Sequence, residues 1–572
     1  MEKVAKMAFI SHICRTNQLI HTIMRHLLPT LIGLFALVAC SPAPETTTTD
    51  IFRFNSLGYQ PSLPKQATIL VDSVTEFRLR RASDDRIVYK GELGAVRTQE
   101  DVKQSARIAD FTEYQGTGAH YLEIEGVGRS REFNIAPDAY NEAYASVMRA
   151  FYLWRCGCEV EYTHNGIRYH QDACHHNDGY EDYIGNKGGH HDGTGGWHDA
   201  GDYGKYVVNA GITTNLLFWA WEAFQPELEG VTIGLPETAP AYPEYLKEMK
   251  WEIDWVLKMA YPDGSGRVSH KLTATNFAGF IMASEDGQKR YYTPWSSAAT
   301  ADYVAMLAQA ARAFAPYDKE YADKCLAAAR HSYDFLRTSP EERFVQGDFK
   351  TGGYQTRDDD DRLWAAAEMW ETTGEALYLA DFEQMAEQME FKIDADWDWG
   401  DVSNSGMFRY ALSKREGKNP TIESTIRKNI IDSANSIVQT SQNDIYGRPL
   451  ARYYWGCNGT VARQALNLYV ASQLQDDSQY KATALNAVSH IFGRNYYDRS
   501  YVTGVGHNPP MHPHDRRSGA DGIEAPWPGY IVGGGHSATD WVDEQESYSH
   551  NEVAINWQAG AVFALAWFVD AN

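Results

Sequence analysis

The segment GGWHDAGDYGKY, residues 195–206, places two aspartates three positions apart, directly behind a tryptophan and a histidine. Gly195, Gly196 and Gly201 permit the tight backbone of a loop. From Tyr203 onward apolar residues recur at helical spacing, so the segment is expected to lead into a helix. Backbone N–H groups at a helix start can hold Asp199 and Asp202 ionised, which suits a general base that activates water. The alternative is an N-capping aspartate with a solvated neighbour.

Length and charge limit the classes of protein that this chain can represent. Its 572 residues suffice for two or three domains with sizeable cores. The net charge of -24 at pH 7 would repel the phosphate backbone of nucleic acid, so no nucleic-acid partner is expected. The aromatic content of 13% is high, and an acidic protein rich in tryptophan and tyrosine can stack those rings on sugars.

The N-terminus has the features of an export signal. An apolar run over residues 27–39 is too short to span a bilayer comfortably, and the tetrapeptide LVAC ending at Cys40 resembles the lipobox of bacterial lipoproteins. We therefore predict a lipoprotein-type leader over residues 1–39 and a flexible tether over residues 40–51. The protein is expected to be exported and lipid-anchored at a bacterial cell-envelope membrane. The alternative is a periplasmic or secreted protein without the anchor.

Two domains are expected after the tether. Residues 52–136 contain short alternating runs separated by turn residues, and about seven strands of this kind predict an immunoglobulin-like β-sandwich. Residues 138–572 have helical periodicity with long loops, which predicts an all-α toroid of helix pairs with a cleft built by the loops. An open solenoid is the alternative, but no strict repeat supports it. The candidate helices cover residues 140–155, 204–222, 242–259, 296–314, 321–336, 361–372, 376–389, 422–440, 461–473, 480–491 and 553–569.

Two thiols and two imidazoles form a candidate metal site. They belong to Cys156, Cys174, His175 and His198. Four such ligands complete tetrahedral zinc and leave no position for a reactive water, so the site is expected to be structural. Since His198 directly precedes Asp199, the metal would brace the loop of the candidate base. The alternative is a Cys156–Cys174 disulfide beside a surface histidine, and Cys158 could compete for either role.

A later segment offers hydrogen-bond donors on one short loop. It reads SYVTGVGHNPPMHPHDR over residues 500–516, and its Gly, Asn and Pro residues predict an ordered loop. His512, His514 and Arg516 could donate to sugar hydroxyls, with the planar guanidinium giving paired hydrogen bonds. A surface loop rich in histidine and proline is an equally common interpretation.

The last polar segment, WVDEQESYSHNEVAINWQA over residues 541–559, places Glu552 just ahead of an apolar helix. Asp543 and Tyr548 lie on the loop before it. To act as a general acid at neutral pH, Glu552 needs a raised pKa, which burial among the aromatic residues and repulsion from the aspartate pair could provide. The alternative is a glutamate that only interacts with the helix dipole. Two carboxylate groups of this kind meet the requirement for glycoside hydrolysis if they lie within roughly 10 Å of each other.

Together, these three segments resemble the active-site segments of glycoside hydrolase family 9, the inverting β-1,4-glucanases. Residues 268–282 (VSHKLTATNFAGFIM), 293–302 and 364–369 agree as well, and the resemblance covers about residues 52–570. It implies an N-terminal all-β immunoglobulin-like sandwich followed by an (α/α)6 barrel with an open cleft. It also implies hydrolysis of β-1,4-glucosidic bonds in cellulose or cello-oligosaccharides, with no organic cofactor.

The resemblance also implies a role for each candidate residue. Asp202 would be the general base, Asp199 would help to hold the nucleophilic water, and Glu552 would be the general acid. The sugar site nearest the cleaved bond would be lined by His514, Arg516, Asp543 and Tyr548. The four cysteine and histidine residues match the zinc ligands of the branch that carries the immunoglobulin-like domain. That branch also binds calcium, for which the acidic run at residues 358–361 is the candidate, although a solvated loop is the alternative.

Some positions depart from the family pattern. Asp515 stands where many members have a second histidine, and Gln558 stands where they have asparagine. Asp515 would add an anion near the sugar site, and the long loop over residues 161–192 could close one end of the cleft. Both features favour the alternatives of an exo-acting β-glucosidase or an exo-β-glucosaminidase on short oligosaccharides. A glycan-binding surface protein without turnover and a zinc-dependent hydrolase are further alternatives.

Overall fold

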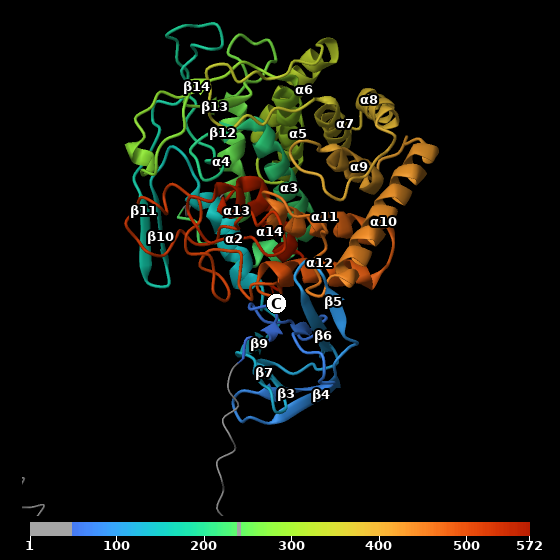
Figure 1. The fold of residues 1–572 in the computed structure, drawn as a ribbon. Helices are drawn as coiled ribbons and strands as arrows, with labels where there is room; N and C mark the ends of the chain where they lie inside the picture. The colour runs from blue at the N-terminus through green and yellow to red at the C-terminus, as the bar shows by residue number, and fades with distance from the viewer. Residues whose placement is uncertain (1–48, 237–241, 572) are drawn as a thin grey trace, which may run out of the picture. The chain divides into compact units, whose positions relative to one another are not determined.

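The computed structural model describes residues 49–236 and 242–571. The predicted leader and most of the predicted tether, including Cys40, lie outside the described residues. Strands come first along the described chain and helices follow (Figure 1). Within the described ranges, no helix combines the length and the apolar character that a bilayer span requires.

The N-terminal strands form two antiparallel sheets. The strands are β1 (Phe52–Arg53), β2 (Gln66–Ile69), β3 (Glu76–Arg81), β4 (Ile87–Glu92), β5 (Arg97–Gln99), β6 (Gln104–Asp110), β7 (Gly118–Ile124), β8 (Gly128–Arg129) and β9 (Phe133–Ile135). One sheet has the order β1-β2-β6-β5, and the other has the order β4-β3-β7-β8 with β9 paired to β7. Because side chains alternate across a strand, β3 buries Phe77 and Leu79 but not the arginines beside them. Residues of both sheets share one apolar core, as the predicted sandwich requires.

Helices make up most of the remaining chain. They are α2 (Asn141–Leu153), α3 (Val207–Glu229), α4 (Glu244–Lys258), α5 (Ser297–Phe314), α6 (Lys319–Thr338), α7 (Asp359–Thr373), α8 (Ala376–Gln388), α9 (Ser403–Leu412), α10 (Pro420–Asn443), α11 (Cys457–Leu474), α12 (Ser478–Ile491), α13 (Tyr548–Asn551) and α14 (Ile555–Ala566), with the 3-10 helix η1 (Ala283–Glu285). Short strands lie between them: β10 (Val160–His164), β11 (Ile167–Gln171), β12 (Lys205–Tyr206), β13 (Lys271–Thr273) and β14 (Tyr291–Tyr292).

Six helices form a closed inner ring. Each packs against the next in the order α3, α5, α7, α9, α11, α14, and α14 returns to α3. Inner helices are buried around their whole circumference, as α5 is along nearly all its residues. Outer helices bury one stripe, and α6 does so at Tyr321, Cys325, Ala329, Ser332 and Leu336. The ring with its outer helices is an (α/α)6 barrel, which confirms the predicted fold class.

Two local predictions were wrong. The inner helix α9 is absent from the predicted set, because a helix buried on all sides has no amphipathic pattern to reveal it. Gly406 lets α9 approach α7 closely, because a Cβ added at this position would lie 2.4 Å from the side chain of Leu363 in α7. The helix predicted from residue 204 begins at Val207 instead, because Lys205 and Tyr206 pair with β13 as a strand.

The β-sandwich contacts the loop at residues 500–516. The Ser56 hydroxyl donates to the carbonyl of Phe492 at 2.5 Å and accepts from the backbone N–H of His507 at 2.9 Å. Gln60 donates to the carbonyl of Phe568 at 2.8 Å, just beyond α14. The bond to His507 attaches the β-sandwich to the segment that carries the predicted sugar-binding histidine and arginine.

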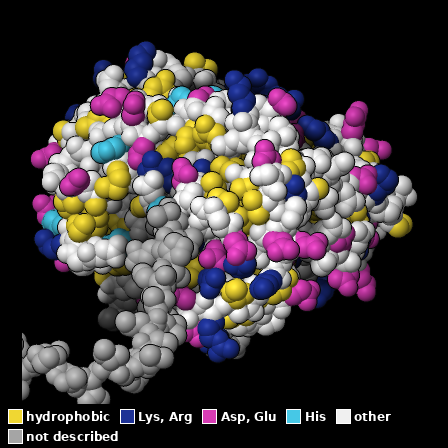
Figure 2. All heavy atoms as spheres, turned by 60° about the horizontal axis from the view of Figure 1, so that its bottom comes forward, with side chains coloured by type: hydrophobic (Ala, Val, Ile, Leu, Met, Phe, Trp, Pro, Cys, Tyr) yellow, Lys and Arg dark blue, Asp and Glu magenta, His cyan; other side chains and the backbone are white. Residues whose placement is uncertain are grey.

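Acidic and basic side chains are interspersed on the surface. On the face shown in Figure 2, acidic groups lie beside the lysines and arginines, and the described residues there present no continuous basic area.

Candidate active site

The two aspartates of the loop before β12 receive different hydrogen bonds. Asp199 accepts from the amide of Asn209 at 2.7 Å and from the hydroxyl of Tyr354 at 2.6 Å. Asp202 accepts from the hydroxyl of Tyr206 at 2.8 Å and from the backbone N–H of Gly204 at 3.1 Å. Side chains from α3, β12 and a distant loop therefore hold the pair.

The donors that hold the aspartates are not the expected N–H groups of a helix start. The helix begins at Val207, and the backbone N–H that Asp202 receives comes from Gly204, ahead of the helix. Burial and the charge of Asp202 raise the pKa of Asp199 to about 8, against the opposing hydrogen bonds from Tyr354 and Asn209. Burial and the neighbouring anion thus outweigh the local donors in setting the pKa of Asp199.

A close approach joins this loop to the loop at residues 500–516. A Cβ added at Gly201 would lie 2.1 Å from the carbonyl oxygen of His514. Arg516 donates to the Gly201 carbonyl from its backbone N–H at 3.2 Å and from its guanidinium at 2.5 Å. Only glycine at this position allows the two motifs to meet.

Glu552 is brought to the same place from the C-terminal end of the chain. It follows α13, and its backbone bridges that of His514. Burial raises the pKa of Glu552 well above its usual range, and the charges of Asp202 and Asp199 add to the effect while Arg516 opposes it. This is the direction that a general acid requires, because the carboxyl keeps its proton at neutral pH.

One pocket of about 360 Å³ contains all three carboxyl groups. Its size suits a small number of sugar rings. The rest of its wall is mostly aromatic or polar, and includes Tyr206, Phe277, Tyr354, Asp398, Trp399, Trp455, Asn556 and Trp557. The early aspartates and the late glutamate therefore line one cavity.

Three of the predicted sugar-binding residues lie near this pocket. The Nδ1 of His514 lies 2.6 Å from the carbonyl of Gln545, which orients the ring. Tyr548 is 53% exposed, and its ring packs edge-on against that of Trp455. The guanidinium of Arg516 lies 5.3 Å from the centre of the Phe277 ring. Together they give the cleft an aromatic rim with cationic and imidazole donors.

Asp543 has a different environment from the predicted one. Its carboxylate accepts from the side chain of Arg499 and the backbone of Met511, both at 2.9 Å. It also accepts from the backbone of His512 at 2.9 Å and the side chain of Asn551 at 3.2 Å. With both oxygens engaged by protein donors, Asp543 joins the two loops, and its contact with a sugar stays a prediction.

Asp515 and Gln558, the two residues that depart from the family pattern, are both buried. Asp515 accepts from the backbone and hydroxyl of Ser518 and lies 3.5 Å from Arg517, so the expected extra anion at the sugar site was wrong. Its short side chain is used to close a local turn. Gln558 donates to the carbonyls of Val147 and Gly529, both at 2.7 Å, and so fixes α14 against α2.

Several residues of the pocket were missed by the sequence analysis. Tyr206 and Tyr354 touch the aspartates directly, and Trp399 and Trp455 form its aromatic wall. Tyr354 has a backbone φ of 44°, a strained conformation for a tyrosine, and such strain gathers at functional sites. No sequence signal reveals Tyr354. Tyr206 lies inside the first motif, where its hydroxyl is a visible candidate donor to the aspartates.

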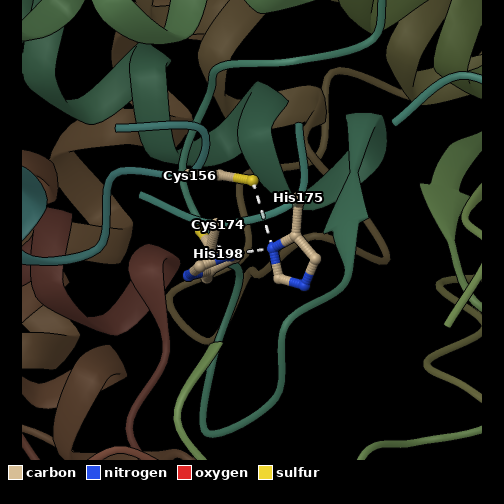
Figure 3. Close-up of side chains that lie close together, drawn as sticks. All are labelled: Cys156, Cys174, His175 and His198. Atoms are coloured by element: carbon tan, nitrogen blue, oxygen red, sulfur yellow. Dashed lines mark hydrogen bonds between the residues drawn. The ribbon is translucent and has the colours of Figure 1, made fainter. Parts of the chain in front are cut away.

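The four candidate metal ligands come together in the structure. Their ligand atoms all lie within 4.8 Å of one another, and all four residues are buried. Figure 3 shows the Nδ1 of His175 facing both Cys156, at 3.6 Å, and the Nε2 of His198, at 3.2 Å. The cysteines of this cluster are free thiols, so the disulfide alternative is not what the structure has.

Polar residues around the cluster fix its geometry. The other ring nitrogen of His175 lies 3.5 Å from Asp286, which leaves Nδ1 free for a metal. Asp178 pairs with Lys205 at 2.8 Å and Arg290 at 3.0 Å beside the thiols. Two soft thiols and two imidazoles in a buried tetrad are the donor set that zinc prefers.

The acidic run at residues 358–361 begins α7 and is largely buried. Asp358 pairs with Arg362 at 2.6 Å, and Asp360 accepts from the backbone of Val402 at 2.6 Å. Both oxygens of Asp361 and of Asp302 are buried without a hydrogen-bond partner among the described residues. Unpaired buried carboxylates suit a bound cation better than a solvated loop does.

Comparisons with known proteins agree with this geometry. The model of glycosyl hydrolase family 9 matches residues 140–565, and the model of the cellulase N-terminal Ig-like domain matches residues 47–129. Endoglucanase D of Acetivibrio thermocellus is 53% identical over 524 residues, which cover 91% of this chain and 83% of the relative. A metagenome-derived endoglucanase of the same family has a similar solved structure, with a TM-score of 0.83, 32% identity and coverage of 91% and 98%. A zinc-binding triple mutant of endoglucanase J30 aligns with a TM-score of 0.84 and 30% identity, over 90% of this chain and 100% of that one.

Proposed function

Because this chain belongs to glycoside hydrolase family 9, we propose that it is an inverting endoglucanase that hydrolyses β-1,4-glucosidic bonds in cellulose or cello-oligosaccharides. The observation that carries the proposal is the shared pocket of Asp199, Asp202 and Glu552, with aromatic rings around it. A sugar ring can stack on the aromatic wall while its glycosidic oxygen faces the glutamate.

The residues divide the reaction between an acid and a base. Glu552, which keeps its proton through burial and nearby anions, protonates the leaving glycosidic oxygen. Asp202 accepts a proton from the attacking water, which Asp199 helps to orient. The water attacks the anomeric carbon from the face opposite to the leaving group, so the configuration inverts.

The stereochemistry of the first product tests this mechanism. Proton NMR during hydrolysis of cellohexaose is expected to show the α-anomer first, with the β-anomer growing in later through mutarotation. A β-anomer as the initial product contradicts inversion. Hydrolysis of carboxymethyl cellulose with a rapid fall in viscosity supports internal cleavage, and the release of single sugars without a viscosity change favours exo action.

Exo action on short oligosaccharides is the second candidate. The observation in its favour is that the long loop at residues 161–192 attaches to the loop that carries Tyr354. The hydroxyl of Tyr183 donates to Asp348 at 3.2 Å, and its ring packs on Phe349. This contact supports a wall beside the cleft. A preference for glucosamine has less support, since Asp515 is buried away from the sugar site.

Two metal ions belong to the same proposal. Zinc in the tetrad of Cys156, Cys174, His175 and His198 would be neutralised by two thiolates and would brace the loop that begins at Asp199. With four protein ligands it offers no open position, so the hydrolysis does not run through it. Calcium near Asp361 and Asp302 is supported by their unpaired oxygens.

For localisation, we propose export and a lipid anchor at Cys40. The support is the apolar run and lipobox-like tetrapeptide of the sequence. In a Gram-negative host, wild-type protein is expected in the membrane fraction, and Cys40→Ala is expected to release it or to leave its leader uncleaved. Mass spectrometry that finds an unmodified N-terminus beyond Cys40 in the wild type contradicts the anchor.

A further inference from the structure

We propose that Lys271 is a positioning residue for the base of this reaction: it fixes Tyr206, the donor to Asp202, and places a buried positive charge behind that donor. This inference rests on the proposed function, because it assigns Lys271 a part in the chemistry of the same pocket. Lys271 does not line the pocket and would act through Tyr206 and through its charge.

The sheet beside the pocket places Lys271 behind the base. In the antiparallel pair of β12 and β13, Lys271 lies directly opposite Tyr206. The side chain is fully buried, and its ammonium donates to Gln346 at 2.8 Å, to Thr351 at 3.2 Å and to the carbonyl of Gly352 at 2.7 Å. Lys271 therefore holds the turn that lies against Tyr206.

A short chain of hydrogen bonds leads from this turn to the base. The backbone N–H of Gly352 donates to the hydroxyl oxygen of Tyr206 at 3.0 Å. That hydroxyl donates in turn to Asp202 at 2.8 Å. A tyrosine hydroxyl with one accepted and one donated bond is fixed in orientation, so Lys271 determines where the donor to Asp202 points.

The charge of Lys271 has no carboxylate in contact. Its three hydrogen-bond acceptors are neutral, and Lys271 forms no ion pair with any of the described residues. The ring of Phe344 lies 5.1 Å from the ammonium, and that of Tyr206 lies 5.6 Å from it. Burial lowers the pKa of Lys271 to about 7, and the charge of Asp202 opposes this shift. The ammonium is thus present on the acidic side of neutrality.

Other titratable groups face Asp202 from each neighbouring element. They are Asp199 on its own loop, Tyr206 on β12, Lys271 on β13, His514 on the loop at residues 500–516 and Glu552 after α13. Burial lowers the pKa of His514, which leaves that ring neutral above mildly acidic pH. The carboxyl groups repel one another, and two buried cations lie against them: Arg516, which donates to the carbonyl of Gly201, and Lys271 behind Tyr206.

Lys271→Met tests the proposal because it removes the charge and keeps the length of the side chain. The profiles of kcat and kcat/KM against pH are measured on cellohexaose. We expect the acid limb to move to higher pH by about one unit and kcat at pH 5 to fall about tenfold, with KM changed less than about twofold. A purely structural role would lower activity at all pH values without moving the limb.

A second variant covers the case in which Lys271→Met does not fold. Tyr206→Phe interrupts the hydrogen-bond chain while retaining the charge, and it is expected to lower kcat several-fold with little change in KM. Lys319→Met, which removes an exposed lysine charge on α6, is the matched control and keeps the wild-type profile. Circular dichroism melting establishes which variants are folded.

The outcomes separate this inference from the proposed function. A folded Lys271→Met with the wild-type acid limb overturns the inference, and so does an unfolded Lys271→Met together with a fully active Tyr206→Phe. Wild-type protein without activity on any β-1,4-glucan overturns the proposed function itself. An active wild type with the shifted limb in Lys271→Met supports both.

Discussion

Glu552→Gln is expected to reduce kcat on cello-oligosaccharides by a factor of about 10² to 10⁴, with a smaller change in KM. Glutamine retains the size and the hydrogen-bonding atoms of the side chain but has no proton to give to the leaving oxygen. The effect should be largest for substrates with poor leaving groups, such as cellohexaose. An activated aryl glycoside, which needs less protonation, should lose less activity.

The same substitution is expected to stabilise the fold near neutral pH. The pKa of Glu552 in the folded protein lies well above its value of about 4.3 in an unfolded chain. The folded state therefore holds this proton to higher pH, and the wild type loses stability as the pH rises above the unfolded pKa. Glu552→Gln removes that cost, so its melting temperature should exceed that of the wild type at pH 7 and match it near pH 4.

The wild-type activity should follow the same titration. On the alkaline side, kcat/KM falls as Glu552 loses the proton that it must donate. Glu546→Gln is the matched control, because Glu546 is exposed on the same segment, and it should retain wild-type activity and stability. Near-wild-type turnover in Glu552→Gln would contradict the assignment of the general acid.

Removal of the proposed zinc is expected to destabilise the protein strongly without abolishing catalysis at low temperature. A metal whose free concentration is a thousand times its dissociation constant contributes about 4 kcal/mol to the free energy of unfolding. The tetrad ties Cys156 at the end of α2 to Cys174 and His198 on long loops, so its loss frees those loops. The melting temperature should fall on chelation and recover on addition of zinc.

Elemental analysis checks the stoichiometry directly. We expect one zinc per chain in the wild type and none in Cys156→Ser, while Cys325→Ser, which changes a buried thiol on α6, should keep the metal. Activity that persists after chelation in the cold separates a structural metal from a catalytic one. A wild type without zinc, or with a disulfide found by thiol counting, would contradict the prediction.

The sequence determined which residues meet but gave less about their environments. The three motifs predicted a common pocket for Asp199, Asp202 and Glu552, and the structure has it. The sequence assigned Asp543 to the sugar and Asp515 to the rim of the cleft, whereas both make hydrogen bonds to nearby loops. Whether a carboxylate faces solvent or its own backbone depends on turns that no local pattern specifies.

What the sequence determined by itself was the fold class, because strand alternation and helical periodicity are local properties of the chain. The metal ligands were equally accessible, since cysteine and histidine have few alternative uses in a buried tetrad. Only the tertiary structure decided the electrostatics of the pocket. The raised pKa of Glu552 and the place of Lys271 behind Tyr206 arise from groups far apart in the sequence, and burial is set by the whole fold rather than by neighbours in sequence.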